Sequence, residues 1–130
     1  MPVRFYPSII NGVKVNLTET IKKVRNPHFG KFKFDPETGN KITEHIEDRS
    51  LYNAIALFLE EAGDDRYVIT DTEFGIMAFF GNKTKLKDSV FQKLPAFQEA
   101  DDSKYIEFIS FLNDNNIKFE VDSFIIFQFS

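Results

Sequence analysis

The sequence contains no cysteine and no tryptophan, and only two histidines. Without cysteine, the chain forms no disulfide, offers no thiolate nucleophile and builds no cysteine-ligated zinc site. The histidines, His28 and His45, are too far apart for the paired spacing of a helical zinc site. The six glycines are scattered and form no phosphate-binding loop. We therefore expect neither a metal nor a cofactor.

Long apolar runs are also missing. Residues 1–7 hold no apolar stretch long enough for a signal peptide, and no run approaches the ~20 residues of a membrane-spanning helix. The longest run, around residues 124–127, has the length of a strand. We expect a cytoplasmic protein without membrane contact, and the lack of cysteine suits such a reducing compartment.

The composition is that of a chain that folds by itself. It has 130 residues, of which 42% are hydrophobic, and 16 of them are phenylalanine. This length falls in the usual range for one domain, and each phenylalanine ring can bury ~150–250 Å². No linker or internal repeat divides the chain, so we expect a single domain over residues 1–130.

Turn signals predict two β-hairpins near the N-terminus. Residues 9–10 and 13–17 flank Asn11-Gly12, a dipeptide suited to a two-residue hairpin turn. Residues 31–34 alternate lysine with phenylalanine before Asp35-Pro-Glu-Thr-Gly-Asn40, which is typical of a type I turn closed by a left-handed glycine. The chain returns over residues 41–46, and we expect Ile42 and Ile46 to face the core.

Two segments have the apolar spacing of helices with one buried face. Residues 50–62 form the first, with Ser50 placed to cap the start and Gly63 to close the end. Residues 103–114 form the second, preceded by the capping oxygens of residues 101–103. A short helix is also expected over residues 84–93.

The remaining segments are expected to be strands. Residues 67–70 and 75–80 form a pair joined through residues 71–74, and residues 117–129 close the chain as one strand or a pair of strands. That last segment has apolar residues on both faces, which favours a central strand. Hairpins require antiparallel pairing, so we predict an α+β fold: a mostly antiparallel sheet with two main helices packed on one face.

Charge is distributed unevenly along the chain. Seven Lys and Arg but only Glu19 among acidic residues lie in residues 1–34, whereas the rest has nine Lys and Arg against nineteen Asp and Glu. The densest acidic group surrounds the end of the first predicted helix, where the negative end of the helix dipole disfavours anions. It consists of Glu60, Glu61, Asp64 and Asp65. In sequence only Arg66 is close enough to counter it, so either solubility or a basic partner explains it.

The basic segment from Lys22 to Phe34 is a candidate for nucleic-acid binding. Its cations could neutralise phosphates while its phenylalanines stack on bases. Those cations are Lys22, Lys23, Arg25, Lys31 and Lys33. The competing interpretation is a half-buried strand with Phe32 and Phe34 facing inward and the lysines outward.

Two further features are weaker candidates for a functional site. Glu44-His45-Ile-Glu47-Asp48 could hold a general base, but Glu47 and Asp48 also suit the positive end of the helix that follows. Aromatic residues near loops and helix edges could anchor an interface. These are Tyr52, Phe74 and Phe97.

These features rank three functions. The first is a small non-catalytic inhibitor that binds a basic or nucleic-acid-handling protein through the acidic group. Immunity proteins and phage counter-defence proteins, including CRISPR inhibitors, are of this type. The second is a nucleic-acid-binding accessory protein that uses the basic segment. An enzyme centred on His45 comes last. The partner's identity, the source organism and the oligomeric state stay open.

Overall fold

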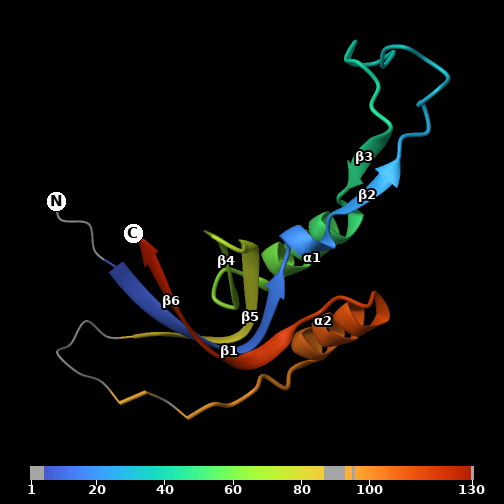
Figure 1. Ribbon diagram of the computed structural model, residues 1–130. Helices are drawn as coiled ribbons and strands as arrows, with labels where there is room; N and C mark the ends of the chain where they lie inside the picture. Colours follow the sequence, from blue (N-terminus) through green and yellow to red (C-terminus); the bar gives the residue numbers. More distant parts are fainter. Residues whose placement is uncertain (1–4, 87–92, 95, 130) are drawn as a thin grey trace.

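A four-stranded antiparallel sheet forms the centre of the molecule (Figure 1). The computed structural model describes residues 5–86, 93–94 and 96–129. The strand order is β4-β5-β1-β6. The strands are β1 (Phe5–Asn16), β4 (Tyr67–Thr72), β5 (Gly75–Lys85) and β6 (Glu120–Phe129). The predicted pair around residues 71–74 is confirmed, since β4 and β5 are joined by that turn.

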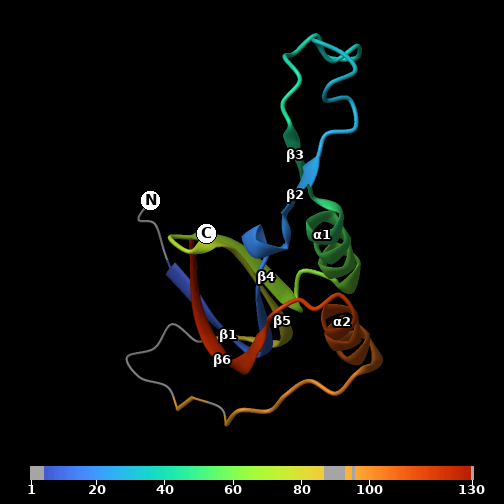
Figure 2. The ribbon, with the colours of Figure 1, turned by 45° about the vertical axis from the view of Figure 1, so that its right-hand side comes forward.

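Two helices pack against one face of this sheet (Figure 2). Helix α1 (Ser50–Ala62) and helix α2 (Ser103–Asp114) have the predicted bounds. Both contribute to the main core, together with Val13, Val15 and Phe80 from β1 and β5. The predicted α+β class, with an antiparallel sheet and two helices on one face, is therefore confirmed. No helix in the described part of the chain is long and apolar enough to span a membrane.

A second, smaller core lies on the other face of the sheet. It consists of Ile10, Val68, Phe79 and Ile126, with Met77 and Phe124 packed against them. Adjacent residues of one strand point to opposite faces, which is why Phe79 and Phe80 belong to different cores. The strands β1, β5 and β6 are long and visibly bent (Figure 1).

The hairpin predicted at Asn11-Gly12 is wrong. Strand β1 continues through these residues without a turn. Gly12 lies opposite both Gly81 of β5 and Asp122 of β6. A Cβ atom on Gly12 would stand 2.1 Å from the carbonyl oxygen of Phe80. Glycine is needed here because the backbones of β1 and β5 approach too closely for a side chain, and not because the chain turns.

Of the second predicted hairpin only the turn is correct, and it lies outside the central sheet. Residues 31–34 and 41–44 form no strands and share only an isolated bridge between Phe34 and Lys41. Strands β2 (Lys22–Arg25) and β3 (His45–Asp48) form a separate two-stranded sheet that projects from the body (Figures 1 and 2). We call residues 22–48 the arm. Its turn has the predicted chemistry, since Asp35 accepts a hydrogen bond from the backbone of Gly39, which has a φ of 75°. Ile46 is 42% exposed, so the expectation that it faces the core is wrong.

Two expectations about the second half of the chain also need correction. Thr84 and Lys85 end strand β5 instead of starting a helix, and residues 87–92 of that predicted helix lie outside the described residues. Strand β6 is at an edge of the sheet and not at its centre. Its apolar residues Ile125 and Phe127 are 48% and 65% exposed. Apolar residues on both faces of this strand therefore do not mean that both faces are covered.

Candidate binding surfaces

Four exposed carboxylates surround the C-terminal end of α1. Glu60 and Glu61 lie in the last helical turn, and Asp64 and Asp65 lie in the turn that follows. Gly63 separates the pairs in a conformation with φ of 103°, and its N–H donates to the carbonyl of Leu59. We call the four carboxylates the acidic cluster. Among the ion pairs between described residues, none involves these side chains.

Lysines that are distant in sequence approach the acidic cluster. Lys104 of α2 reaches the carbonyl oxygen of Glu61 at 3.4 Å, and Lys83 of β5 donates to that of Asp64 at 3.1 Å. Lys83 also lines, with Asp64, Asp65 and Lys85, an open hollow of about 430 Å³. The helix terminus therefore receives the cations that its dipole favours, while the carboxylates face solvent beside them.

A second acidic segment lies next to this cluster. Both carboxylate oxygens of Asp102 accept hydrogen bonds from Arg66, at 2.7 and 3.1 Å. The guanidinium holds the pKa of Asp102 below its ordinary value, because it stabilises the charged form. The Asp102 side chain was expected to cap α2, but it makes no capping hydrogen bond to the helix. Glu99 accepts a hydrogen bond of 2.8 Å from the hydroxyl of Tyr105.

The basic residues of the arm are divided between two settings. In the antiparallel pair, Lys22 lies opposite Asp48 and Lys23 opposite Glu47, so these cations face carboxylates. Arg25 lies opposite His45. The remaining candidates for nucleic-acid binding, Lys31 and Lys33, lie beyond the paired strands and are exposed. The structure therefore does not gather the five candidate cations into one basic face.

The phenylalanines of the arm are exposed, contrary to the half-buried strand that alternation favoured. Phe32 and Phe34 are each 53% exposed, and Phe29 is 39% exposed. Only an isolated bridge between Phe34 and Lys41 continues the pairing here. We call residues 28–41 the arm tip. The ammonium of Lys33 lies over the ring of Phe34, 5.9 Å from the ring centroid.

The acidic residues around His45 have structural roles. Glu47 forms an ion pair of 3.0 Å with Arg49. Asp48 accepts hydrogen bonds from the backbone N–H and the hydroxyl of Ser50, and these bonds lower the pKa of Asp48. Ser50 is thus the first residue of α1 and not its cap. His45 itself is exposed on the arm.

An apolar hollow of about 680 Å³ opens beside the turn between β4 and β5. The residues that line it include Lys14, Asp71, Glu73, Phe74, Met77 and Phe124. Phe74, expected from sequence to be an exposed aromatic, is 75% exposed at this opening. The ammonium of Lys14 lies 5.5 Å from the centroid of the Phe124 ring and pairs with Glu120 at 2.9 Å. This hollow could not be predicted from the sequence, because its walls come from three separate segments of the chain.

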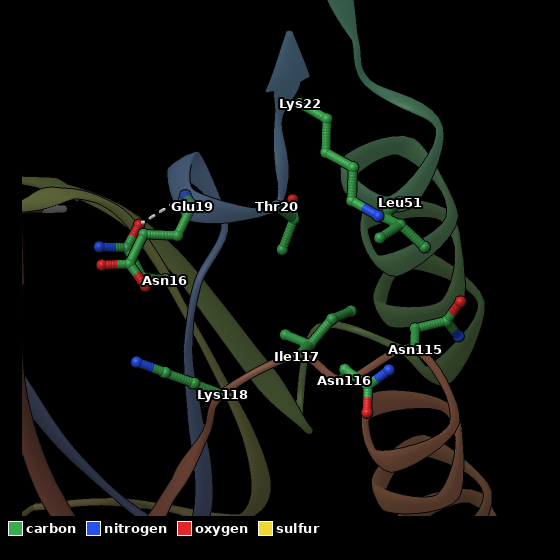
Figure 3. Close-up of a pocket in the computed structure, with 9 residues that line it drawn as sticks. All are labelled: Asn16, Glu19, Thr20, Lys22, Leu51, Asn115, Asn116, Ile117 and Lys118. Carbon is green, nitrogen blue, oxygen red and sulfur yellow. Dashed lines mark hydrogen bonds between the residues drawn. The ribbon is translucent and has the colours of Figure 1, made fainter. Parts of the chain in front are cut away.

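A polar pocket of about 330 Å³ lies between the 3-10 helix η1 (Thr18–Thr20), the start of α1 and the end of α2 (Figure 3). Two of its side-chain amides are engaged. Asn16 donates to the carbonyl of Phe74 and accepts from the N–H of Glu19, and Asn115 donates to the carbonyl of Phe111. These two amides therefore hold the connections between the elements together.

Within the described residues, no group of three or more His, Asp or Glu side chains is arranged to hold a metal ion. Comparisons with protein-family models, with curated protein sequences and with solved structures found no match to this chain.

Proposed function

We propose that this chain is a small non-catalytic protein that binds and blocks another protein with a basic or nucleic-acid-binding surface. The observation that carries the proposal is the acidic cluster, which stays exposed at a helix end where the dipole disfavours it. Among the described residues none of its four carboxylates forms an ion pair, so all four remain available to a partner.

The contacts of the fold leave the carboxylates of the cluster accessible. Lys104 and Lys83 bond the backbone carbonyl oxygens of Glu61 and Asp64, and Arg66 pairs with Asp102, so none of these cations forms an ion pair with the cluster. Carboxylates gathered in this way can occupy a cationic groove in place of phosphates. Clustered charge of one sign also speeds encounter with an oppositely charged partner. This mechanism is steric and electrostatic, as in immunity proteins and phage counter-defence proteins such as CRISPR inhibitors.

The experiment begins with capture of the partner from the native host and its identification by mass spectrometry. Association rates are then measured at low and high salt for the wild type and for a variant with the cluster neutralised. The variant carries Glu60→Gln, Glu61→Gln, Asp64→Asn and Asp65→Asn. We expect a slower association at low salt and a weaker salt dependence, since exposed charges act mainly on encounter.

A matched control removes four exposed carboxylates elsewhere, so that the net charge changes equally. It carries Glu37→Gln, Glu44→Gln, Glu107→Gln and Asp114→Asn. The proposal requires this control to bind faster than the cluster variant. Equal rates for the cluster variant and the wild type at low salt would refute it.

A second candidate function, nucleic-acid binding, is favoured by one observation at the arm tip. Exposed Lys31 and Lys33 lie beside the exposed rings of Phe32 and Phe34, which suits phosphate and base contacts. The carboxylates facing β2 reduce the basic character of the rest of the arm. Fluorescence anisotropy with single-stranded DNA and RNA tests nucleic-acid binding. This function requires an affinity that falls steeply as salt is added and that is lower in the variant Lys31→Ala/Lys33→Ala than in the wild type.

A further inference from the structure

The arm tip and the apolar hollow are complementary, and each is exposed in the single chain. We propose that two copies of this chain associate by reciprocal arm exchange, with the arm tip of each copy seated in the apolar hollow of the other. This inference is independent of the acidic cluster, which belongs to neither surface. It also gives a use to exposed aromatic residues that the proposed function leaves unexplained.

The arm tip is held in shape by its own hydrogen bonds. Asn26, only 9% exposed, receives the N–H of His28 on its side-chain oxygen and donates its own N–H to the carbonyl of Glu44. At the far end, Asp35 and Asn40 close the turn through a backbone bond of 2.8 Å. A segment ordered before association loses less conformational entropy on binding, so its exposed rings can contribute to affinity.

The arm does not cover the hollow of its own chain. Figures 1 and 2 show the arm projecting away from the central sheet, on the side of α1. The hollow opens at the turn between β4 and β5. Both apolar surfaces thus face solvent in one copy, which is unfavourable for groups as large as Phe32 and Phe74.

The charges around the two surfaces are of opposite sign. In the hollow, the ammonium of Lys14 is neutralised by Glu120, which leaves Asp71 and Glu73 as the charges of the rim. On the arm tip, Lys31 and Lys33 flank the exposed rings. The turn of the tip also carries Asp35 and the exposed Glu37, but with Lys41 the tip has three cations against two carboxylates and stays positive overall. The lysines therefore meet the acidic rim when the rings enter the hollow.

Reciprocal exchange gives a closed assembly. When each copy inserts its arm into the other, one two-fold axis relates the copies and no binding surface is left to recruit a third. Every contact then occurs twice, so a substitution acts twice on the dimerisation constant. Two equal contacts also double the buried area, which favours a stable dimer over a transient encounter.

Sedimentation velocity of the full chain over a wide range of concentration measures this directly. We expect a monomer–dimer equilibrium in the wild type, and a dimer about a hundredfold weaker in Phe32→Ser/Phe34→Ser, from about tenfold at each of two interfaces. Phe97→Ser, which changes another half-exposed ring outside both surfaces, is the control and leaves the equilibrium unchanged. A wild type that is monomeric at every concentration would overturn the proposal.

Charge reversal gives a test that mere destabilisation cannot imitate. One variant carries Lys31→Glu and Lys33→Glu, and the other carries Asp71→Lys and Glu73→Lys. Each alone places like charges at both interfaces and is expected to be monomeric, whereas their mixture restores opposite charges at both and forms a heterodimer. Circular dichroism confirms that each variant is folded. A mixture of folded variants that stays monomeric while the wild type dimerises would place the interface elsewhere.

Discussion

Gly12 of β1 lies opposite Gly81 of β5, and neither position has room for a side chain. A Cβ atom on Gly12 would meet the Phe80 carbonyl oxygen at 2.1 Å, and one on Gly81 would meet that of Asn11 at 2.2 Å. Both obstacles are backbone atoms of the neighbouring strand, which cannot move aside without breaking the pairing. The approach of β1 and β5 therefore depends on both glycines.

Replacing Gly12 with alanine should destabilise the fold severely. Forcing one methyl group into a packed region costs about 1–3 kcal/mol, and an obstacle of backbone atoms places this variant at or above the top of that range. Urea unfolding measures the free energy. Gly39→Ala is the control, because nothing lies within 4 Å of that position and only its φ of 75° opposes the change. The two variants losing equal stability would show that the close approach is not what Gly12 provides.

The same glycine shows where sequence reasoning failed for the fold. Asn-Gly between two apolar runs predicts a hairpin from local preferences alone, whereas the role of Gly12 depends on a strand about 70 residues away. Helices α1 and α2 were predicted with correct bounds, because their buried faces repeat at helical spacing within one segment. The position of β6 at the sheet edge could not be read from its residues, since an exposed apolar strand has the same pattern as a central one.

The ion pair between Arg66 and Asp102 should make stability depend on pH in the acid range. The pKa of Asp102 is lowered in the folded protein from an ordinary value of 3.8. The pair therefore stabilises the fold fully above that ordinary value, and the contribution is lost as the pH falls through the lowered pKa. Asp102→Asn should cost roughly 0.5–1 kcal/mol at pH 7, because Arg66 loses its anion but solvent screens the pair, in which the Asp102 side chain is 40% exposed.

Urea unfolding of both proteins between neutral pH and strongly acid pH tests this. The difference in unfolding free energy between wild type and Asp102→Asn should narrow as the pH falls. Asp101→Asn is the matched control, because Asp101 is exposed and forms no ion pair with a described residue. A difference that stays constant down to the acid limit would mean that the pair contributes nothing through its charge.

Phe80 is the centre of the main core, and its truncation should be among the most damaging substitutions. Its side chain is fully buried, and its ring lies 5.1 Å from that of Phe108 and 5.9 Å from that of Phe58. Phe80→Ala should cost about 3–5 kcal/mol. Phe58 is only half-buried, so Phe58→Ala should cost less, roughly 2–3 kcal/mol. Urea midpoints in the reverse order would mean that the core is centred on α1.

The candidate surfaces were only partly predictable. Charge alone identified the acidic cluster, because four carboxylates at a helix end are unusual in any fold. The lysines beside it were missed, since Lys83 and Lys104 approach through tertiary contacts. The exposure of Phe32 and Phe34 was also missed, because alternation of lysine and phenylalanine does not reveal whether another element covers the apolar side.

Tyr67 reports on the charge of the cluster. Burial raises the pKa of its phenol, and the negative charge of Asp64, whose carboxylate accepts a hydrogen bond from the hydroxyl at 3.4 Å, raises it further. Asp64→Asn should therefore lower the pKa of Tyr67 toward its ordinary value of 10.0. Ultraviolet absorbance during alkaline titration follows the phenolate. Glu107→Gln should leave the titration unchanged, and an unchanged titration in Asp64→Asn as well would mean that their coupling is negligible.

Neutralising the whole acidic cluster should leave the fold as stable as the wild type or slightly more stable. Removing an anion from a helix C-terminus increases the free energy of unfolding by about 0.3–1 kcal/mol at low salt. The same change removes the attraction of that anion to the nearby lysines, which lowers the free energy of unfolding. Both effects are small at exposed positions and oppose each other, so we expect a change in unfolding free energy within about 1 kcal/mol. Thermal and urea unfolding at low and high salt measure this change, with the variant carrying Glu37→Gln, Glu44→Gln, Glu107→Gln and Asp114→Asn as the control.

A loss of stability well beyond that range would make the cluster a structural element, and slower partner binding by the variant would then follow from unfolding. Preserved stability with slower association would leave partner recognition as the reason for carboxylates at this helix end.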